Sequence, residues 1–177
     1  MSTLKVNSII PTGGVPTGGG GGIIQVKTAT KTDQFTSTST SFVDITGLST
    51  TMTCSSSSNK ILLRYDILFG GDWWTSGPAY LSLVADSTRI GIGTVGENSD
   101  SNVTTFHNLY ANNQNNSSYN VATSCASFLY TPGDTNSHTY KVQGRMQNSS
   151  SGFAINRRWH SDVRCAISTL TLFEVSA

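Results

Sequence analysis

The sequence has few charged residues and no long apolar run. Only 12% of its 177 residues are charged, about half the share in an average soluble domain. Eleven Lys and Arg against ten Asp and Glu leave a net charge of +1, without a run of like charge that would favour nucleic acid. No apolar stretch approaches the ~18 residues of a membrane span. The N-terminus MSTLKVNSII, with one lysine and a broken apolar stretch, does not resemble a secretory signal. We therefore expect no nucleic-acid and no membrane partner.

Cysteine and histidine are also scarce, and their spacing excludes the common metal and disulfide sites. The three cysteines are odd in number and match no zinc or redox motif, which argues against a disulfide framework. Free cysteines are among the most buried residues, so we predict three small buried thiols: Cys54, Cys125 and Cys165. The histidines lie far from one another and from any ligand at metal-binding spacing: His107, His138 and His160. We expect no bound metal and no cofactor.

The sequence also lacks an arrangement typical of a catalytic site. It has no GxSxG turn, and among 26 serines a chance pairing with a histidine means nothing. Asp66, Asp72 and Asp86 are candidates for the paired carboxylates of a glycosidase. A domain of this size, however, lacks the long cleft-forming scaffold that cleavage of polysaccharide generally needs. We therefore expect a protein that is not an enzyme.

Small polar residues and glycine take the place of the missing charges. The chain has 26 Ser, 24 Thr, 13 Asn and 17 Gly. Ser, Thr and Asn side chains compete with the helical backbone for hydrogen bonds, and glycine loses too much entropy in a helix. The same residues suit short strands joined by many turns. The composition therefore favours an all-β fold.

Apolar residues alternate with polar ones from residue 23 to the end of the chain. The most apolar segment is 60–71, where every second residue between Ile61 and Phe69 is large and apolar. A short turn at Asp86 and Ser87 predicts a hairpin. The predicted strands are 23–31, 41–49 (ending at Gly47), 51–54, 60–71, 79–87, 88–96, 103–110, 121–130, 137–147, 153–159 and 165–175. Since no segment has a sustained helical period, we predict an antiparallel β-sandwich, jelly-roll-like, over residues 23–177.

Residues 1–22 differ from the rest and are predicted to be an N-terminal arm. Their few apolar residues cannot form a core and need a partner surface: Leu4, Val6, Ile9 and Ile10. A glycine-rich hinge follows them, either flexible or closely packed: Gly18, Gly19, Gly20, Gly21 and Gly22. The glycine run is not a phosphate-binding loop, because it enters a strand and lacks the terminal Gly-Lys-Ser/Thr.

Two aromatic clusters are candidates for surface recognition. GGDWWTSGPAY (70–80) has adjacent tryptophans, of which one can be buried while the other stacks on a sugar or contacts a subunit. NRRWHSD (156–162) combines arginines with Trp159, which suits an anionic glycan, a pairing with Asp162 or a neighbouring subunit. The candidate recognition residues are Trp73, Trp74, Tyr110, Arg158 and Trp159, with His160 and the asparagine-rich loop 112–118 beside them.

Four stretches of the sequence resemble parts of known proteins. They are the opening STLKVNSIIPTGGVPTGGGGGIIQVK, the strand SSSSNKILLRY, the hairpin FLYTPGDTNSHTYKVQGR and the C-terminal ISTLTLFEVSA. Together they resemble a family of small virion structural proteins of tailed phages that infect cyanobacteria and other aquatic bacteria, described as tail-fibre-like. The similarity spans nearly the whole chain and is most specific in the N-terminal stretch. It implies a noncatalytic, β-rich virion component that is often an oligomeric appendage.

These observations lead to one expected function and two alternatives. We expect a tail-fibre-like virion protein that forms a homo-oligomer, a trimer, and whose arm docks on another virion protein of the tail, baseplate or capsid. An arm of this kind can add a strand to an exposed sheet edge. The alternatives are a capsid decoration or head-fibre protein, and a module that binds a receptor or glycan on the host surface.

Overall fold

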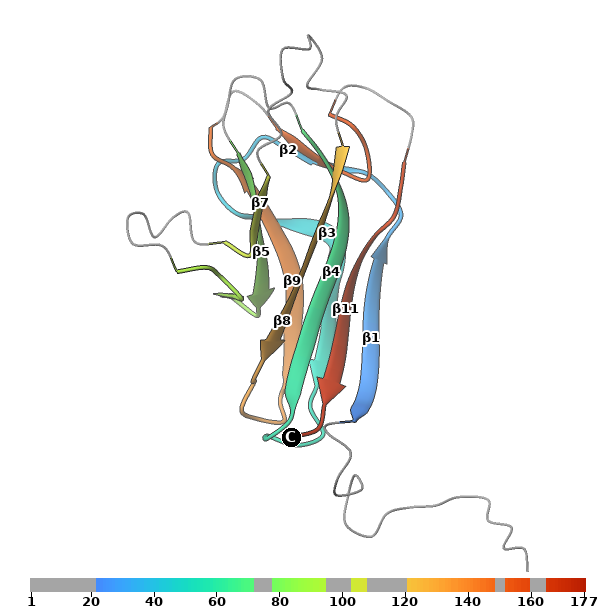
Figure 1. Cartoon of the computed structure of the whole chain (residues 1–177), viewed down its shortest axis with the longest axis vertical. Helices are drawn as coiled ribbons and strands as arrows, with labels where there is room; N and C mark the ends of the chain where they lie inside the picture. The colour runs from blue at the N-terminus through green and yellow to red at the C-terminus, as the bar shows by residue number, and fades with distance from the viewer. Residues whose placement is uncertain (1–21, 72–77, 95–102, 108–120, 149–151, 160–164) are drawn as a thin grey trace, which may run out of the picture.

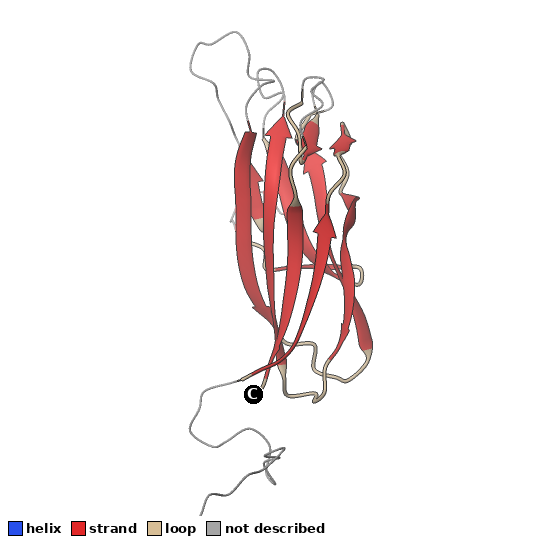
Figure 2. Cartoon of the chain, turned by 90° about the vertical axis from the view of Figure 1, so that its right-hand side faces the viewer, coloured by secondary structure: helices blue, strands red, loops and turns tan. Residues whose placement is uncertain are grey.

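Every regular element in the described part of the chain is a β-strand (Figure 2). The computed structural model describes residues 22–71, 78–94, 103–107, 121–148, 152–159 and 165–177. The strands are β1 (Ile23–Lys31), β2 (Phe35–Ser37), β3 (Val43–Thr53), β4 (Lys60–Gly71), β5 (Ala79–Ala85), β6 (Thr88–Ile90), β7 (Thr105–His107), β8 (Val121–Tyr130), β9 (Ser137–Met146), β10 (Phe153–Ile155) and β11 (Ser168–Val175).

The strands form two antiparallel sheets packed face to face (Figure 1). Sheet A has the order β1-β11-β4-β10-β2, and β8 pairs with the opposite edge of β4. Sheet B has the order β3-β9-β5-β6, and β7 also pairs with β5. In each sheet, two strands lie end to end along the same edge of one longer strand. β11 and β10 pair with successive parts of β4, as β6 and β7 do with β5.

Joining these interrupted strands gives a jelly roll. We count β1 with β2, β6 with β7 and β10 with β11 as one strand each, which leaves eight strands in chain order. Sheet A then contains the first (β1 and β2), eighth (β10 and β11), third (β4) and sixth (β8) strands side by side. Sheet B then contains the second, seventh, fourth and fifth. This order, in which two Greek keys are wound into two sheets, is that of a jelly roll. The predicted fold class is confirmed.

The core lies between the sheets and follows the alternation in the sequence. Ile61, Leu63, Tyr65, Ile67 and Phe69 of β4 are all fully buried. They face the buried residues of β3, β5 and β9: Ile45, Leu48, Met52, Leu81, Leu83, Tyr140, Val142 and Met146. The ring of Phe69 stacks on that of Phe153, with centroids 5.6 Å apart. Gly144 leaves room for Phe153, because a Cβ there would lie 2.6 Å from the ring.

Several predicted strand ends were wrong, and the reason is local. β3 does not end at Gly47 but continues to Thr53. Gly47 has a left-handed backbone (φ +87°), and it lies in a bulge between Asp44 and Ser49, after which β3 pairs with β9 again. β6 ends at Ile90, before Gly91 (φ +60°). β10 ends at Ile155, before Asn156 (φ +65°). β2 was not predicted, since three residues are too few to show an alternating pattern.

The predicted burial of the cysteines was wrong for two of the three. All are free thiols; Cys54 is buried, but Cys125 and Cys165 are exposed. Cys125 alternates with the inward-facing Ser124 on β8, so its side chain points to the outer face of sheet A. Cys165 lies in the segment before β11.

A buried carboxylate holds the lower end of the sandwich, where β1 begins and β11 ends (Figure 1). Glu174 has no exposed surface and accepts hydrogen bonds from neutral donors only among the described residues. The donors are Ser55 N (2.7 Å), Ser55 Oγ (2.8 Å), Asn59 Nδ2 (2.6 Å) and Gln25 Nε2 (2.6 Å). Burial alone would raise the pKa of Glu174, but these bonds outweigh it and the pKa lies below its ordinary value.

The same end also ties the chain termini of the sandwich together. Gly22 N donates to Ser176 Oγ (3.1 Å), and Ser176 N donates to the Gly22 carbonyl (3.0 Å). Ala177 N donates to Asn59 Oδ1 (3.3 Å), which links it to the Glu174 cluster. Gly22, the last residue of the predicted hinge, is thus hydrogen-bonded to Ser176, directly after β11. The remainder of the predicted arm and hinge lies outside the described residues.

We expect Glu174→Gln to destabilise the fold by about 2–4 kcal/mol at neutral pH, because an amide group would face the donors of Asn59 and Gln25. Since the folded pKa is lowered, the ionised Glu174 stabilises the protein above its unfolded pKa, and this contribution is lost as the pH falls through the folded pKa. The difference from the wild type should therefore shrink in acid. Urea unfolding at several pH values measures it. Asp66→Asn, at a half-exposed carboxylate that forms a surface ion pair with Arg64, is the control and should cost no more than about 1 kcal/mol. A Glu174→Gln variant that behaves like it would contradict the assignment.

Candidate functional site

The upper end of the sandwich is shaped by the segment between β10 and β11. Asn156 begins this segment with a left-handed backbone (φ +65°), which asparagine tolerates better than most residues. Its N–H donates to the Leu68 carbonyl (2.9 Å), and its carbonyl accepts from Ala166 N (3.0 Å). The chain therefore leaves sheet A at Asn156 and returns to the same point at Ala166.

The side chain of Asn156 bridges the two interrupted strands of sheet A. It is fully buried, and its Nδ2 donates to the carbonyls of Lys31 and Asp33 (both 2.9 Å), where β1 gives way to β2. Its Oδ1 accepts from Ser168 Oγ (2.6 Å), and Ser168 Oγ accepts from Leu68 N (3.1 Å). We call these contacts the Asn156 bridge. They satisfy polar groups at a place where the ladder of both strands is broken.

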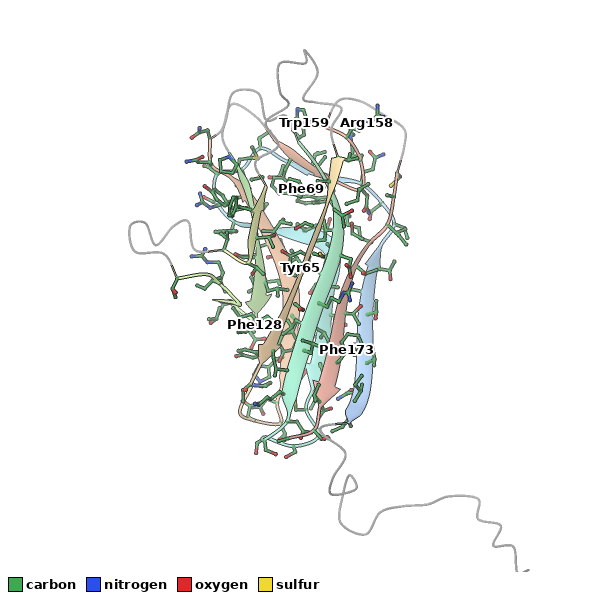
Figure 3. The ribbon with its side chains drawn as sticks, in the orientation of Figure 1. Tyr65, Phe69, Phe128, Arg158, Trp159 and Phe173 are labelled. Carbon is green, nitrogen blue, oxygen red and sulfur yellow. The ribbon has the colours of Figure 1, made fainter. Side chains whose placement is uncertain are left out.

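The residues after Asn156 fold over sheet A. A Cβ on Gly70 would lie 2.3 Å from the Arg157 carbonyl oxygen, so only glycine lets the segment approach β4. Gly152 likewise makes room for the ring of Trp159. Arg157 fixes this conformation, because its guanidinium donates to the carbonyls of Arg158 (2.8 Å) and Trp159 (3.1 Å) and to Gln34 Oε1 (3.2 Å). Arg158 and Trp159 lie at the upper end of the molecule (Figure 3).

A cavity of about 200 Å³ lies beneath this segment. Its described lining residues are Leu68, Val121, Asn156, Arg157, Arg158, Cys165 and Ala166. Arg157 is committed to backbone carbonyls, and the Cys165 thiol contacts the Thr32 carbonyl (Sγ to O, 3.1 Å). The lining combines apolar walls with guanidinium groups, and these described residues include no carboxylate or imidazole. Such a surface suits the binding of a small apolar or anionic group.

A buried lysine lies where β1 ends, next to the Asn156 bridge. Lys31, the last residue of β1, has a fully buried side chain whose Nζ donates to Asp33 Oδ1 at 2.7 Å. The carboxylate is largely exposed, and the hydrogen bond from Lys31 lowers the pKa of Asp33. At the interruption between β1 and β2, Lys31 and Asp33 thus form an ion pair through their side chains and accept hydrogen bonds from Asn156 through their carbonyls.

The structure brings together only part of the predicted recognition surface. Arg158 and Trp159 lie half-buried in the segment over sheet A, beside the cavity. Trp73, Trp74 and Tyr110, together with His160, the loop 112–118 and the arm residues Leu4, Val6, Ile9 and Ile10, lie outside the described residues. Asn156 was not predicted to be the residue whose hydrogen bonds join the interrupted strands of sheet A. The signal available in the sequence was an asparagine directly after a short apolar strand, where a left-handed turn is common.

Neither a metal-binding group among the described residues nor a similar protein indicates a function for the candidate site. Among the described residues no group of His, Cys, Asp and Glu side chains is arranged to hold a metal ion. The described part of the chain contains no helix long and apolar enough to cross a membrane. No protein-family model matches the chain, and no curated protein is significantly similar to it in sequence.

We expect Asn156→Gly to lose about 2–4 kcal/mol of stability, because glycine keeps the left-handed backbone but removes three hydrogen bonds, two of them buried. Asn156→Ala should lose about 1 kcal/mol more, since alanine is strained at positive φ. Urea unfolding compares the two variants with Asn136→Gly, an exposed loop position where the same change should cost no more than about 0.5 kcal/mol. If Asn156→Gly were as stable as Asn136→Gly, the bridge would not be a stabilising element.

Proposed function

We propose that this chain is a non-enzymatic structural protein of a phage virion, a tail-fibre-like appendage. Its N-terminal arm anchors it to another virion protein, and its jelly roll associates with further copies, as a homotrimer. The observation that supports self-association is a row of apolar side chains on the outer face of sheet A. The described chain begins at Gly22 at one end of the jelly roll, and Arg158 and Trp159 lie at the other, an arrangement that supports an anchored appendage.

The apolar row crosses four strands. Val26 of β1 lies opposite Phe173 of β11, Phe173 opposite Leu62 of β4, and Leu62 opposite Leu129 of β8. Directly opposed residues share a face, and the neighbours Leu63 and Leu172 point into the core. Val26 and Leu129 are 49% and 48% exposed. A row of apolar side chains that crosses four neighbouring strands is typical of an interaction site.

Within the described residues, the edge strand next to this row has none of the features that usually discourage pairing. β8 spans ten residues without a charge or a proline, and among the described strands it pairs only with β4. Natural edge strands usually have lysines, prolines or bulges that discourage association. β1, at the opposite edge, has Lys27 and Lys31. The charged residues of β4 on this face, Arg64 and Asp66, form an ion pair with each other (2.9 Å), so β8 and the apolar row favour a second copy of the chain as partner.

The two ends of the jelly roll support different roles. The chain enters at Gly22 beside the C-terminus, and the first side chains of β1, Ile23 and Ile24, are 61% and 44% exposed. Arg158 and Trp159 lie at the far end (Figure 3). An arm that joins at one end leaves the other end directed away from the particle. A capsid decoration or head-fibre protein would use the same geometry and remains the alternative, as does a module that binds a host receptor.

We expect the wild-type protein to be oligomeric and Leu129→Lys to be monomeric in sedimentation velocity, because a charge would be buried in the proposed interface. Thr51→Lys, at an exposed position of β3 in sheet B, is the matched control and should leave the oligomer intact. A monomeric wild type, or an oligomer that tolerates Leu129→Lys but not Thr51→Lys, would rule out this surface.

We expect a protein without residues 1–14 to stay folded and oligomeric but to be absent from assembled particles. Val6→Asp with Ile9→Asp in the full chain should have the same effect, and Thr12→Asp should not, because only the apolar side chains contact the partner. Immunoblotting of purified particles measures incorporation. Normal incorporation of the shortened protein would refute the anchor, and labelling of the particle would separate a tail location from a capsid-wide one.

A further inference from the structure

The outer face of sheet B differs from that of sheet A, because two arginines lie among aromatic rings on it. Arg145 of β9 lies opposite Tyr80 of β5, and Tyr80 lies opposite Phe106 of β7. Phe42, directly before β3, continues the row beyond Arg145. We call Phe42, Arg145, Tyr80 and Phe106, with Arg89 from β6, the arginine–aromatic row.

Stacking holds the two guanidinium groups of the row in place. The Arg145 Cζ lies 4.6 Å from the centroid of Tyr80 and 5.2 Å from that of Phe42. The Arg89 Cζ lies 4.6 Å from the centroid of the same Phe42 ring. Both cations thus contact one ring, and cation–π attraction offsets part of the cost of placing like charges together.

These contacts hold both guanidinium groups at one place on the outer face of sheet B. Arg145 Nη1 also donates to the Thr40 carbonyl (3.5 Å). A guanidinium has five N–H donors, so an arginine that already has partners can still donate to a ligand. These donors match the two oxygens of a carboxylate. Because the side chains are already ordered by the rings, less conformational entropy is lost on binding.

A cavity of about 310 Å³ lies at the arginines. Its described lining residues are Thr40, Ser41, Phe42, Arg89 and Arg145, so two hydroxyl groups accompany the two cations. The nearest acid of β3, Asp44, is held by Lys141 Nζ (2.8 Å) and Gln143 Nε2 (2.7 Å). The hydrogen bond from Lys141 is the main reason why the pKa of Asp44 is lowered, so this carboxylate stays ionised with its own partners.

Phe106 completes the surface. It is 66% exposed and lies two strands from Arg145, a separation of about 10 Å. An exposed ring beside a polar, cationic cavity suits the apolar face of a sugar ring, whereas an acidic peptide would need apolar pockets for its side chains. We propose that the arginine–aromatic row binds an acidic saccharide, with a carboxylate on Arg89 and Arg145 and a neighbouring sugar ring on Phe106. This site goes beyond the structural role proposed above and does not depend on it.

The test is calorimetric titration of the full chain with tetragalacturonate, using neutral galactotetraose, a tetraglutamate peptide and sodium sulfate as comparison ligands. We expect tetragalacturonate to bind more tightly than all three and to weaken as salt is added, since charge contributes to affinity. Arg89→Gln, which keeps a polar side chain but removes the charge, should weaken binding about tenfold or more. Phe106→Ala, at an exposed position, should weaken it by about threefold or more.

Arg64→Gln, on the outer face of sheet A, is the matched control and should leave affinity unchanged. Equal binding of galactotetraose would overturn the role of the arginines, and equal binding of tetraglutamate or sulfate would overturn the assignment to a saccharide. Absence of binding at millimolar tetragalacturonate, or wild-type affinity in both Arg89→Gln and Phe106→Ala, would overturn the site. None of these results bears on the oligomer, which Leu129→Lys tests separately.

Discussion

The fold depends on one buried side chain at a place where two strands are interrupted. Asn156 adopts a left-handed backbone and donates to carbonyls on both sides of the break between β1 and β2, while Ser168 donates to its carboxamide oxygen. Without these bonds, sheet A would have unsatisfied polar groups in its interior. With them, β10 and β11 stay in line along β4, and the segment between them can fold over Gly70 and form a cavity.

The opposite end of the sandwich is closed by a comparable device with a charge at its centre. Glu174 is fully buried and receives only neutral donors from the described residues, which connect β1, β11 and the turn between β3 and β4. This cluster and the bonds between Gly22 and Ser176 fix the direction in which β1 leaves the sandwich.

The two outer faces of the jelly roll suit different partners. In the proposed function, sheet A associates with a copy of the same chain through the apolar row and the uncharged edge strand β8. Sheet B presents the arginine–aromatic row, which favours an anion. With an overall charge of only +1, the difference between the faces comes from placement and not from composition. Association through sheet A would leave sheet B exposed, so a homo-oligomer would display several copies of the proposed saccharide site and gain avidity from them.

The sequence by itself was sufficient for the fold class, for most strands and for the inward residues of β4, because alternation with period two is a local property of a strand. It did not predict the bulge at Gly47, the short strand β2 or the exposure of Cys125 and Cys165, which depend on what lies opposite. The apolar row and the arginine–aromatic row were also invisible in it. Their members are separated by tens of residues, and only the register of antiparallel pairs, which is a non-local property, places them on one face.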